Sequence, residues 1–155
     1  MASSREDKRR VVVKSVEVTT SCHSTEDCEK VRTALLNLLP KTLHSDVRIS
    51  AESLHGFYGN RILLMKTETT NGDLLLKHLA ESLSETEKSI LSASFKLRYD
   101  ARTGRLYLRF SKQDAYMGSL RLLDSDDVVK VVVHFLNAKR EEEVKTLLRQ
   151  IGLIR

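Results

Sequence analysis

The sequence predicts an α+β fold, with a single domain, an antiparallel or mixed β-sheet and about four helices packed mainly on one face. Three observations lead to this prediction. Several segments alternate apolar and polar residues with the period of two that strands show, and others repeat apolar residues at helical spacing. The two kinds of segment do not alternate one for one along the chain, which favours this class. The length of 155 residues is that of one domain.

The first half of the chain predicts three strands and two helices. Residues 11–22 are rich in Val and Thr and lack Gly and Pro, as a strand should. Apolar residues then follow at helical spacing: Cys28, Val31, Leu35 and Leu38. Two more strands are expected at residues 47–51 and 61–69, the second in the middle of the sheet because its apolar run is nearly continuous. The loop His-Gly-Phe-Tyr-Gly-Asn between them predicts a tight reversal, and a further helix is expected after Asn71.

The polar run before the first helix is either a catalytic cluster or a helix start. Ser24 is followed three residues later by Asp27, so we expect Ser24 to be the N-cap of a capping box in which Asp replaces the usual Glu. Glu26, Asp27 and Glu29 also place negative charge near the positive end of the helix dipole. Each of these residues therefore has a role in starting a helix, and His23 has no catalytic partner. We expect no enzymatic activity and no catalytic residue.

The cysteines, histidines and acidic residues predict no metal and no cofactor. Cys22 and Cys28 are too few for a disulfide scaffold or a zinc site, and we expect both to be reduced and buried. The histidines lack ligand spacing. The acidic run with Asp124, Asp126 and Asp127 is suited either to Mg²⁺ or to a solvated loop, and we favour the loop because no second carboxylate cluster accompanies it. Nucleotide-binding and hydrolase motifs are absent from the sequence.

The second half begins with a full capping box at Ser84 and Glu87, which predicts a helix through Leu91. Residues 95–99 and 105–110 then alternate around a turn that contains Gly, which predicts a β-hairpin. Four more elements are expected: a helical turn at residues 111–118, a short strand at 120–122, a buried strand at 128–135, and a last helix capped by Asn137 and ended by Gly152.

The charges on the predicted hairpin are the most informative functional pattern. If its apolar residues point into the core, the outer face carries Lys96, Arg98, Arg105, Tyr107 and Arg109. Arg102 lies at the turn and Lys112 just beyond the second strand, and acidic residues do not alternate among them. Guanidinium groups suit phosphate, and Tyr107 suits stacking on an unpaired base. The alternative is an exposed edge hairpin that uses Lys and Arg to block aggregation.

Several segments of the chain form a combination found together in one family. They are HSTEDCEKVRTALLNLLP, HGFYGNRI, RFSKQDAYMGSLRL and DDVVKVVVHF, followed by NAKREEEVKTLLRQIGLI. These segments resemble a small archaeal family of predicted exosome-associated, RNA-binding proteins. The chain departs from the family at Arg61, where Pro is frequent. The resemblance implies RNA binding, no known enzymatic activity, and a fold like that of the large-subunit ribosomal protein that grips 5S ribosomal RNA. It adds Lys112 and Gln113 as candidate RNA contacts.

Together these patterns predict an RNA-binding protein, a non-catalytic accessory factor in RNA processing or degradation. Residues 1–10, which carry Arg5, Lys8, Arg9 and Arg10, are expected to form a flexible basic arm, and residues 11–155 the domain. The net charge of +5 favours an anionic partner only weakly. We expect structured or ribosomal-type RNA as the partner, with exosome subunits and a second copy of the chain as further candidates. Apolar stretches are too short for a membrane span, so a cytoplasmic location is expected. The alternative function is a protein-interaction adaptor or homodimeric module.

Overall fold

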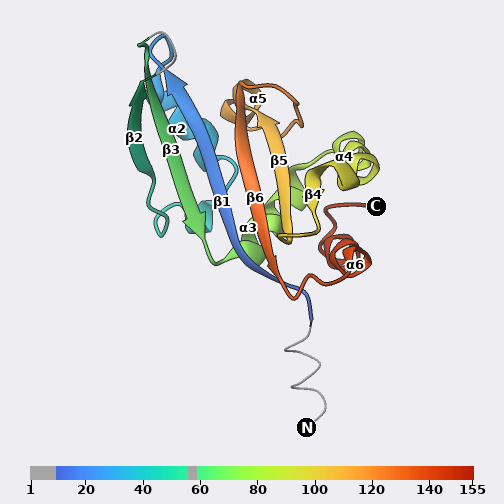
Figure 1. The fold of residues 1–155 in the computed structure, drawn as a ribbon. Coiled ribbons are helices and arrows are strands. Elements are labelled where there is room, and N and C mark those ends of the chain that lie inside the picture. The colour runs from blue at the N-terminus through green and yellow to red at the C-terminus, as the bar shows by residue number, and fades with distance from the viewer. Residues whose placement is uncertain (1–9, 56–58) are drawn as a thin grey trace.

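The computed structural model describes residues 10–55 and 59–155, which form a six-stranded antiparallel sheet with helices packed against it (Figure 1). The strand order is β2-β3-β1-β6-β5-β4. The strands are β1 (Val12–His23), β2 (Ser50–His55), β3 (Arg61–Thr69), β4 (Tyr99–Asp100), β5 (Arg105–Ser111) and β6 (Val128–Leu136). This arrangement confirms the predicted α+β class.

The helices described here cover one face of the sheet. They are α2 (Cys28–Leu36), the 3₁₀ turn η1 (Lys41–Leu43), α3 (Gly72–Ser82), α4 (Glu85–Arg98), α5 (Lys112–Tyr116) and α6 (Glu141–Ile151). Alternate residues of β1 and β6, such as Val16 and Val131, are fully buried against helix residues such as Leu79 and Leu148. The other face of the sheet is turned toward the viewer in Figure 1, uncovered by these helices. None of the helices in the described residues is long and apolar enough to span a bilayer.

Local sequence signals account for most of these elements. The Val- and Thr-rich segment becomes β1, and the segment from Arg61 to Thr69 becomes β3, although β3 lies second from the sheet edge rather than at its centre. Ser84 caps α4 as predicted, since its hydroxyl accepts a hydrogen bond of 3.3 Å from the backbone N–H of Glu87. Gly152 ends α6 in the left-handed conformation, with φ of 92°.

The prediction that residues 95–99 form the first strand of a hairpin is wrong. Helix α4 runs on to Arg98, and the hairpin is reduced to the pairs Tyr99–Leu106 and Asp100–Arg105. Phe95 and Tyr99 are buried in either conformation, because positions four apart lie on one face of a helix and also on one face of a strand. Leu97 distinguishes the helix from the strand. The predicted strand would bury its side chain, but in the structure that side chain is 91% exposed.

Two predictions at the start of α2 are also wrong. The N-cap is Asp27 instead of Ser24, and its carboxylate accepts a 3.0 Å hydrogen bond from the backbone N–H of Glu29. Cys22 and Cys28 are joined by a disulfide instead of being reduced. The end of β1 and the first residue of α2 lie 5.6 Å apart between Cα atoms, a separation that a disulfide can bridge.

Other boundaries differ from the prediction. The second strand begins at Ser50 and runs to His55, later than expected. Asn137 does not cap α6, which starts at Glu141 after Arg140, and Asn137 instead adopts a positive φ of 60°. The short strand expected at residues 120–122 is an isolated bridge between Phe110 and Leu122. Nine residues of the predicted basic arm, and residues 56–58 of the predicted tight loop, lie outside the described part of the chain.

Candidate nucleic-acid interface

Strands β5 and β6 place six side chains together on the uncovered face of the sheet. In β5, Leu106, Leu108 and Phe110 are buried in the core, so the residues between them point to the opposite side. The antiparallel register sets each of these beside a residue of β6: Arg105 opposite His134, Tyr107 opposite Val132, and Arg109 opposite Lys130. We call these six residues the β5–β6 strip.

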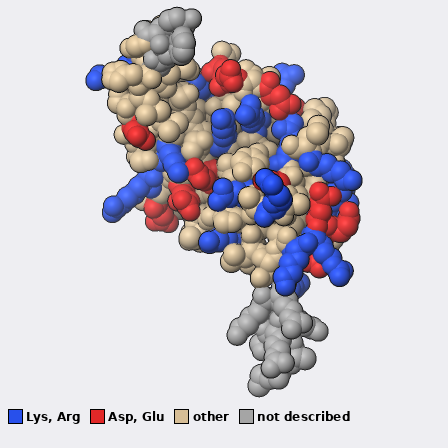
Figure 2. All heavy atoms as spheres, in the orientation of Figure 1, with Lys and Arg blue, Asp and Glu red and all other residues tan. Residues whose placement is uncertain are grey.

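The strip has cations at its two ends and a ring in the middle. Arg105 lies at one end, Arg109 and Lys130 at the other, and Tyr107, which is 43% exposed, lies between them beside Val132. Figure 2 shows Lys and Arg spread over this face of the molecule, with Asp and Glu interspersed. None of the six residues is acidic.

The nearest carboxylate on the next strand is already engaged. Glu17 of β1 lies opposite Val132. Its carboxylate forms an ion pair with the ammonium group of Lys66 of β3, with 2.9 Å between oxygen and nitrogen. Lys66 therefore offsets the charge of Glu17. Glu68 of β3 lies opposite Glu17 and adds one more carboxylate to this face, so the three cations of the strip still outnumber the acidic charge that Lys66 leaves unpaired.

A further cation extends the strip beyond β5. The backbone N–H of Leu123 donates to the carbonyl of Arg109 at 3.0 Å, and that of Ser111 donates to the carbonyl of Arg121 at 2.8 Å. These bonds hold the segment of residues 121–123 alongside β5 and bring exposed Arg121 to the same edge. Sequence reasoning missed Arg121, because the strand expected there was judged by its leucines alone.

The surroundings of His134 favour the neutral form of its imidazole. Burial lowers the pKa of His134 below its usual 6.5. The positive charges of Arg105 and Lys14 lower this pKa further, and the negative charge of Glu68 raises it by a smaller amount. Lys130 and His134 were also missed from sequence, although their period-two spacing in the apolar run VVKVVVHF marks them as the outward residues of β6.

Five of the eight residues predicted to contact RNA lie outside the strip, and the first three are Lys96, Arg98 and Arg102. Lys96 and Arg98 belong to α4, on the helix side of the sheet. The guanidinium of Arg98 donates to the hydroxyl of Ser94 at 2.8 Å and to the carboxylate of Asp124 at 3.3 Å. Arg102 remains exposed in the turn between β4 and β5, where its backbone N–H donates to Asp100.

Lys112 is a buried residue, only 4% exposed. Its ammonium group donates to the carbonyl of Ser21 at 2.7 Å, to both carboxylate oxygens of Glu26 at 3.2 Å, and pairs with Asp127 at 3.1 Å. These contacts tie the end of β1 to the start of β6. Gln113, the next residue, is exposed.

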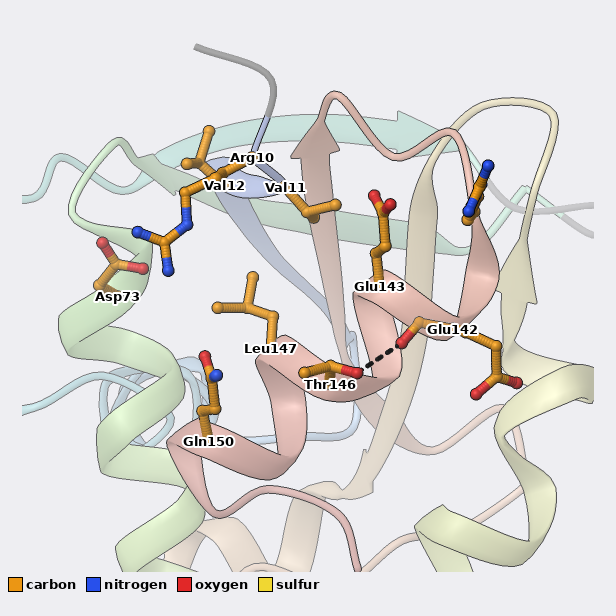
Figure 3. Close-up of a pocket in the computed structure, with 10 residues that line it drawn as sticks. Arg10, Val11, Val12, Asp73, Glu142, Glu143, Thr146, Leu147 and Gln150 are labelled. Carbon is orange, nitrogen blue, oxygen red and sulfur yellow. Dashed lines mark hydrogen bonds between the residues drawn. The ribbon is translucent and has the colours of Figure 1, made fainter. Parts of the chain in front are cut away.

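A hollow of about 900 Å³ lies between the start of β1, α3 and α6 (Figure 3). Apolar surface and carboxylates share its lining: Val11, Val12, Leu147, Asp73, Glu142 and Glu143. In Figure 3 the side chains of Arg10 and Asp73 point toward one another, and the hydroxyl of Thr146 donates to the carbonyl of Glu142. Arg10 and Arg140 also line the hollow, but its three carboxylates outnumber these two cations and disfavour a phosphate. The strip, which has three cations and no carboxylate, is the better candidate for an RNA contact.

Comparisons with known proteins show the family to which the chain belongs. A family described as RNA binding matches residues 15–135, a span that includes every residue of the strip. This chain belongs to that RNA-binding family.

Relatives of this RNA-binding family member share most of their length with it. An RNA-binding protein of Pyrococcus abyssi is 32% identical over 139 residues, which cover 86% of this chain and 90% of the relative. The crystal structure of protein AF2318 from Archaeglobus fulgidus is similar with a TM-score of 0.75 and 28% identity, over 90% of this chain and 99% of that one. A DUF54 protein from Methanothermobacter thermautotrophicus has the same fold, with a TM-score of 0.71 and 24% identity, over 90% of this chain and 97% of that one.

Proposed function

We propose that the protein binds RNA through the β5–β6 strip and acts as a non-catalytic accessory factor in RNA processing or degradation. The observation that carries this proposal is the grouping of Arg105, Arg109 and Lys130 around Tyr107 on an uncovered sheet face of an RNA-binding family member. The family resemblance supports one finer part of the proposal, association with the exosome. A cytoplasmic location is a further part of the proposal and rests on the sequence expectation alone.

The binding mechanism is electrostatic capture of the phosphate backbone. Guanidinium groups bind phosphate oxygens through paired N–H donors, and Lys130 adds a third positive charge beside Arg109. Phosphate contacts fix where a nucleic acid lies but carry little sequence information. The core places its apolar side chains on the opposite face of β5 and β6, so these cations are free to face the RNA.

The salt dependence of RNA affinity tests the site. Three neutralised phosphates give a slope of log affinity against log salt of about −2 for a single strand and about −2.7 for a duplex, on the DNA-calibrated scale. The combined change Arg105→Ala, Arg109→Ala, Lys130→Ala should remove most of that slope. Thermal stability should change little, because exposed charges contribute little to folding.

A control variant with the same change in net charge is available on the helix side. Arg32, Lys77 and Lys96 are exposed residues of α2, α3 and α4. Their combined change to Ala should leave both the affinity and the salt slope near the parent values. Equal losses in the two triple variants would mean that net charge, rather than the strip, governs binding.

A protein-interaction module is the second candidate function. Strand β2 forms one edge of the sheet, and all six of its residues are exposed. Such an edge presents backbone N–H and C=O groups to which another strand can pair. If the strip variant bound RNA as well as the parent does, with the same slope, this candidate would move ahead, and light scattering would show whether a second copy is the partner.

A further inference from the structure

We propose that the β5–β6 strip selects unpaired RNA, with neighbouring bases stacked on the rings of Tyr107 and His134. This inference rests on the proposed RNA-binding function and adds the class of RNA that is bound. The register supplies the geometry: Tyr107 lies opposite Val132, and His134 lies opposite Arg105. The two rings are therefore diagonal neighbours on one face, about 7–8 Å apart at the backbone.

Both rings are free for a ligand. Tyr107 is 43% exposed. Among the described residues, ring–ring contacts join Phe95, Tyr99 and Phe135, and lysines lie over the rings of Phe95 and Tyr116. His134 is half-buried and outward-facing. Aromatic and imidazole rings on a sheet surface are a common support for the faces of unpaired bases.

The charges are placed where the backbone of such a strand would run. Arg105 and Arg109 are four residues apart on β5, a distance of about 14 Å along the strand. The space between them carries the ring of Tyr107 and the apolar side chain of Val132 instead of a further charge. An apolar centre with cations at both ends suits neighbouring bases whose flanking phosphates reach the two ends of the strip.

A duplex offers less to the same surface. Paired bases hide their faces inside the stack, so proteins recognise double-stranded RNA through phosphates and 2′-hydroxyls across the minor groove. A duplex on the strip would reach the three cations but would leave Val132 and both rings without a base to contact. We therefore expect the strip to bind single strands through both phosphate contacts and base stacking, and to bind duplexes through phosphate contacts alone.

Fluorescence anisotropy with two labelled probes tests this inference at one salt concentration. The probes are a single-stranded 12-mer of uridine and a blunt RNA duplex of 12 base pairs. Tyr107→Ala should weaken binding of the single strand by about 5- to 140-fold, the range expected for loss of one stacked base. Its effect on the duplex should be less than about twofold. Tyr107→Phe keeps the ring and should bind both probes like the parent.

A second readout applies to the parent protein itself. A single strand that contains 2-aminopurine should lose fluorescence on binding, because stacking on a ring quenches that base. His134→Ala should reduce the quenching, and Tyr107→Ala should reduce it more strongly. Binding without any quenching by the parent would overturn the inference even if a variant failed to fold.

The outcomes separate this inference from the proposed function. If the parent binds neither probe, RNA binding through the strip is wrong. If the parent binds both probes equally, Tyr107→Ala changes nothing, and removal of the three cations abolishes binding, then the site stands and the preference for unpaired RNA is wrong.

Discussion

Lys112 illustrates, at the residue scale, how position in the fold decides the role of a charge. In the sequence it follows a run of basic and aromatic residues and looks like part of one RNA-binding surface. In the structure its ammonium group is enclosed by one carbonyl and two carboxylates, from Ser21, Glu26 and Asp127. These partners come from segments about 90 residues before it and 15 after it in the sequence. Local patterns carry no information on such contacts.

We therefore expect Lys112→Met to lower the free energy of unfolding by about 1–3 kcal/mol, the cost of leaving polar partners unsatisfied. Urea unfolding measures this loss. The folded variant should retain RNA affinity within about twofold, because Lys112 lies outside the strip. Gln113→Ala is the matched control, an exposed neighbour whose replacement should change stability by less than about 0.5 kcal/mol. A stable Lys112→Met protein with weak RNA binding would return this residue to the interface.

At the element scale, the N-cap of helix α2 differs from the one that the capping pattern predicts. Ser24 and Asp27 both precede α2 and are both of a residue type that makes a good N-cap. The sequence alone favoured Ser24. The disulfide places Cys28, the first residue of α2, beside the end of β1, and Asp27 is the N-cap directly before it. Glu26 is drawn to Lys112 and to the backbone N–H of His23 instead of joining the helix.

Two alanine changes test this assignment directly. Asp27→Ala should lower the free energy of unfolding by about 1 kcal/mol, the usual cost of a lost N-cap. Ser24→Ala should change it by less than about 0.5 kcal/mol, since Ser24 is an exposed residue away from the cap. Chemical unfolding of the two variants beside the parent gives both values. The reverse order of losses would move the start of the helix back to Ser24.

Helix α4 and strand β5 show why half of the site could be predicted and half could not. Arg105, Tyr107 and Arg109 alternate with buried residues in both sequence and structure, so their shared face follows from the period of two. Residues 95–99 fit that period equally well, but the helix that begins at Ser84 continues through them because further turns cost no new nucleation. The local hairpin strand β4 pairs with β5 at only two positions, and the long partner of β5 is β6. Neither segment alone indicates that these two distant strands pair.

At the scale of the whole molecule, the sheet divides the surface into two sides. The described helices pack on one side and bury the core there, while the β5–β6 strip and Lys66 occupy the other. Ion pairs on the helix side, such as that of Arg98 with Asp124, use cations within the fold itself. We therefore expect an anionic partner to bind the uncovered side, where the core leaves the cations of the strip available.

Lysine footprinting tests this division over the chain as a whole. RNA bound to the uncovered sheet face should protect Lys130 from an amine-reactive acetylating reagent by several-fold, because the bound strand excludes the reagent from that surface. Lys77 and Lys96 are exposed residues of α3 and α4, and their modification should be the same with and without RNA. Lys112 is buried and should react slowly in both samples. Mass spectrometry of the digested protein reads all four sites in one experiment. Protection of Lys77 and Lys96 without protection of Lys130 would place the RNA on the helix side and exclude the strip as the interface.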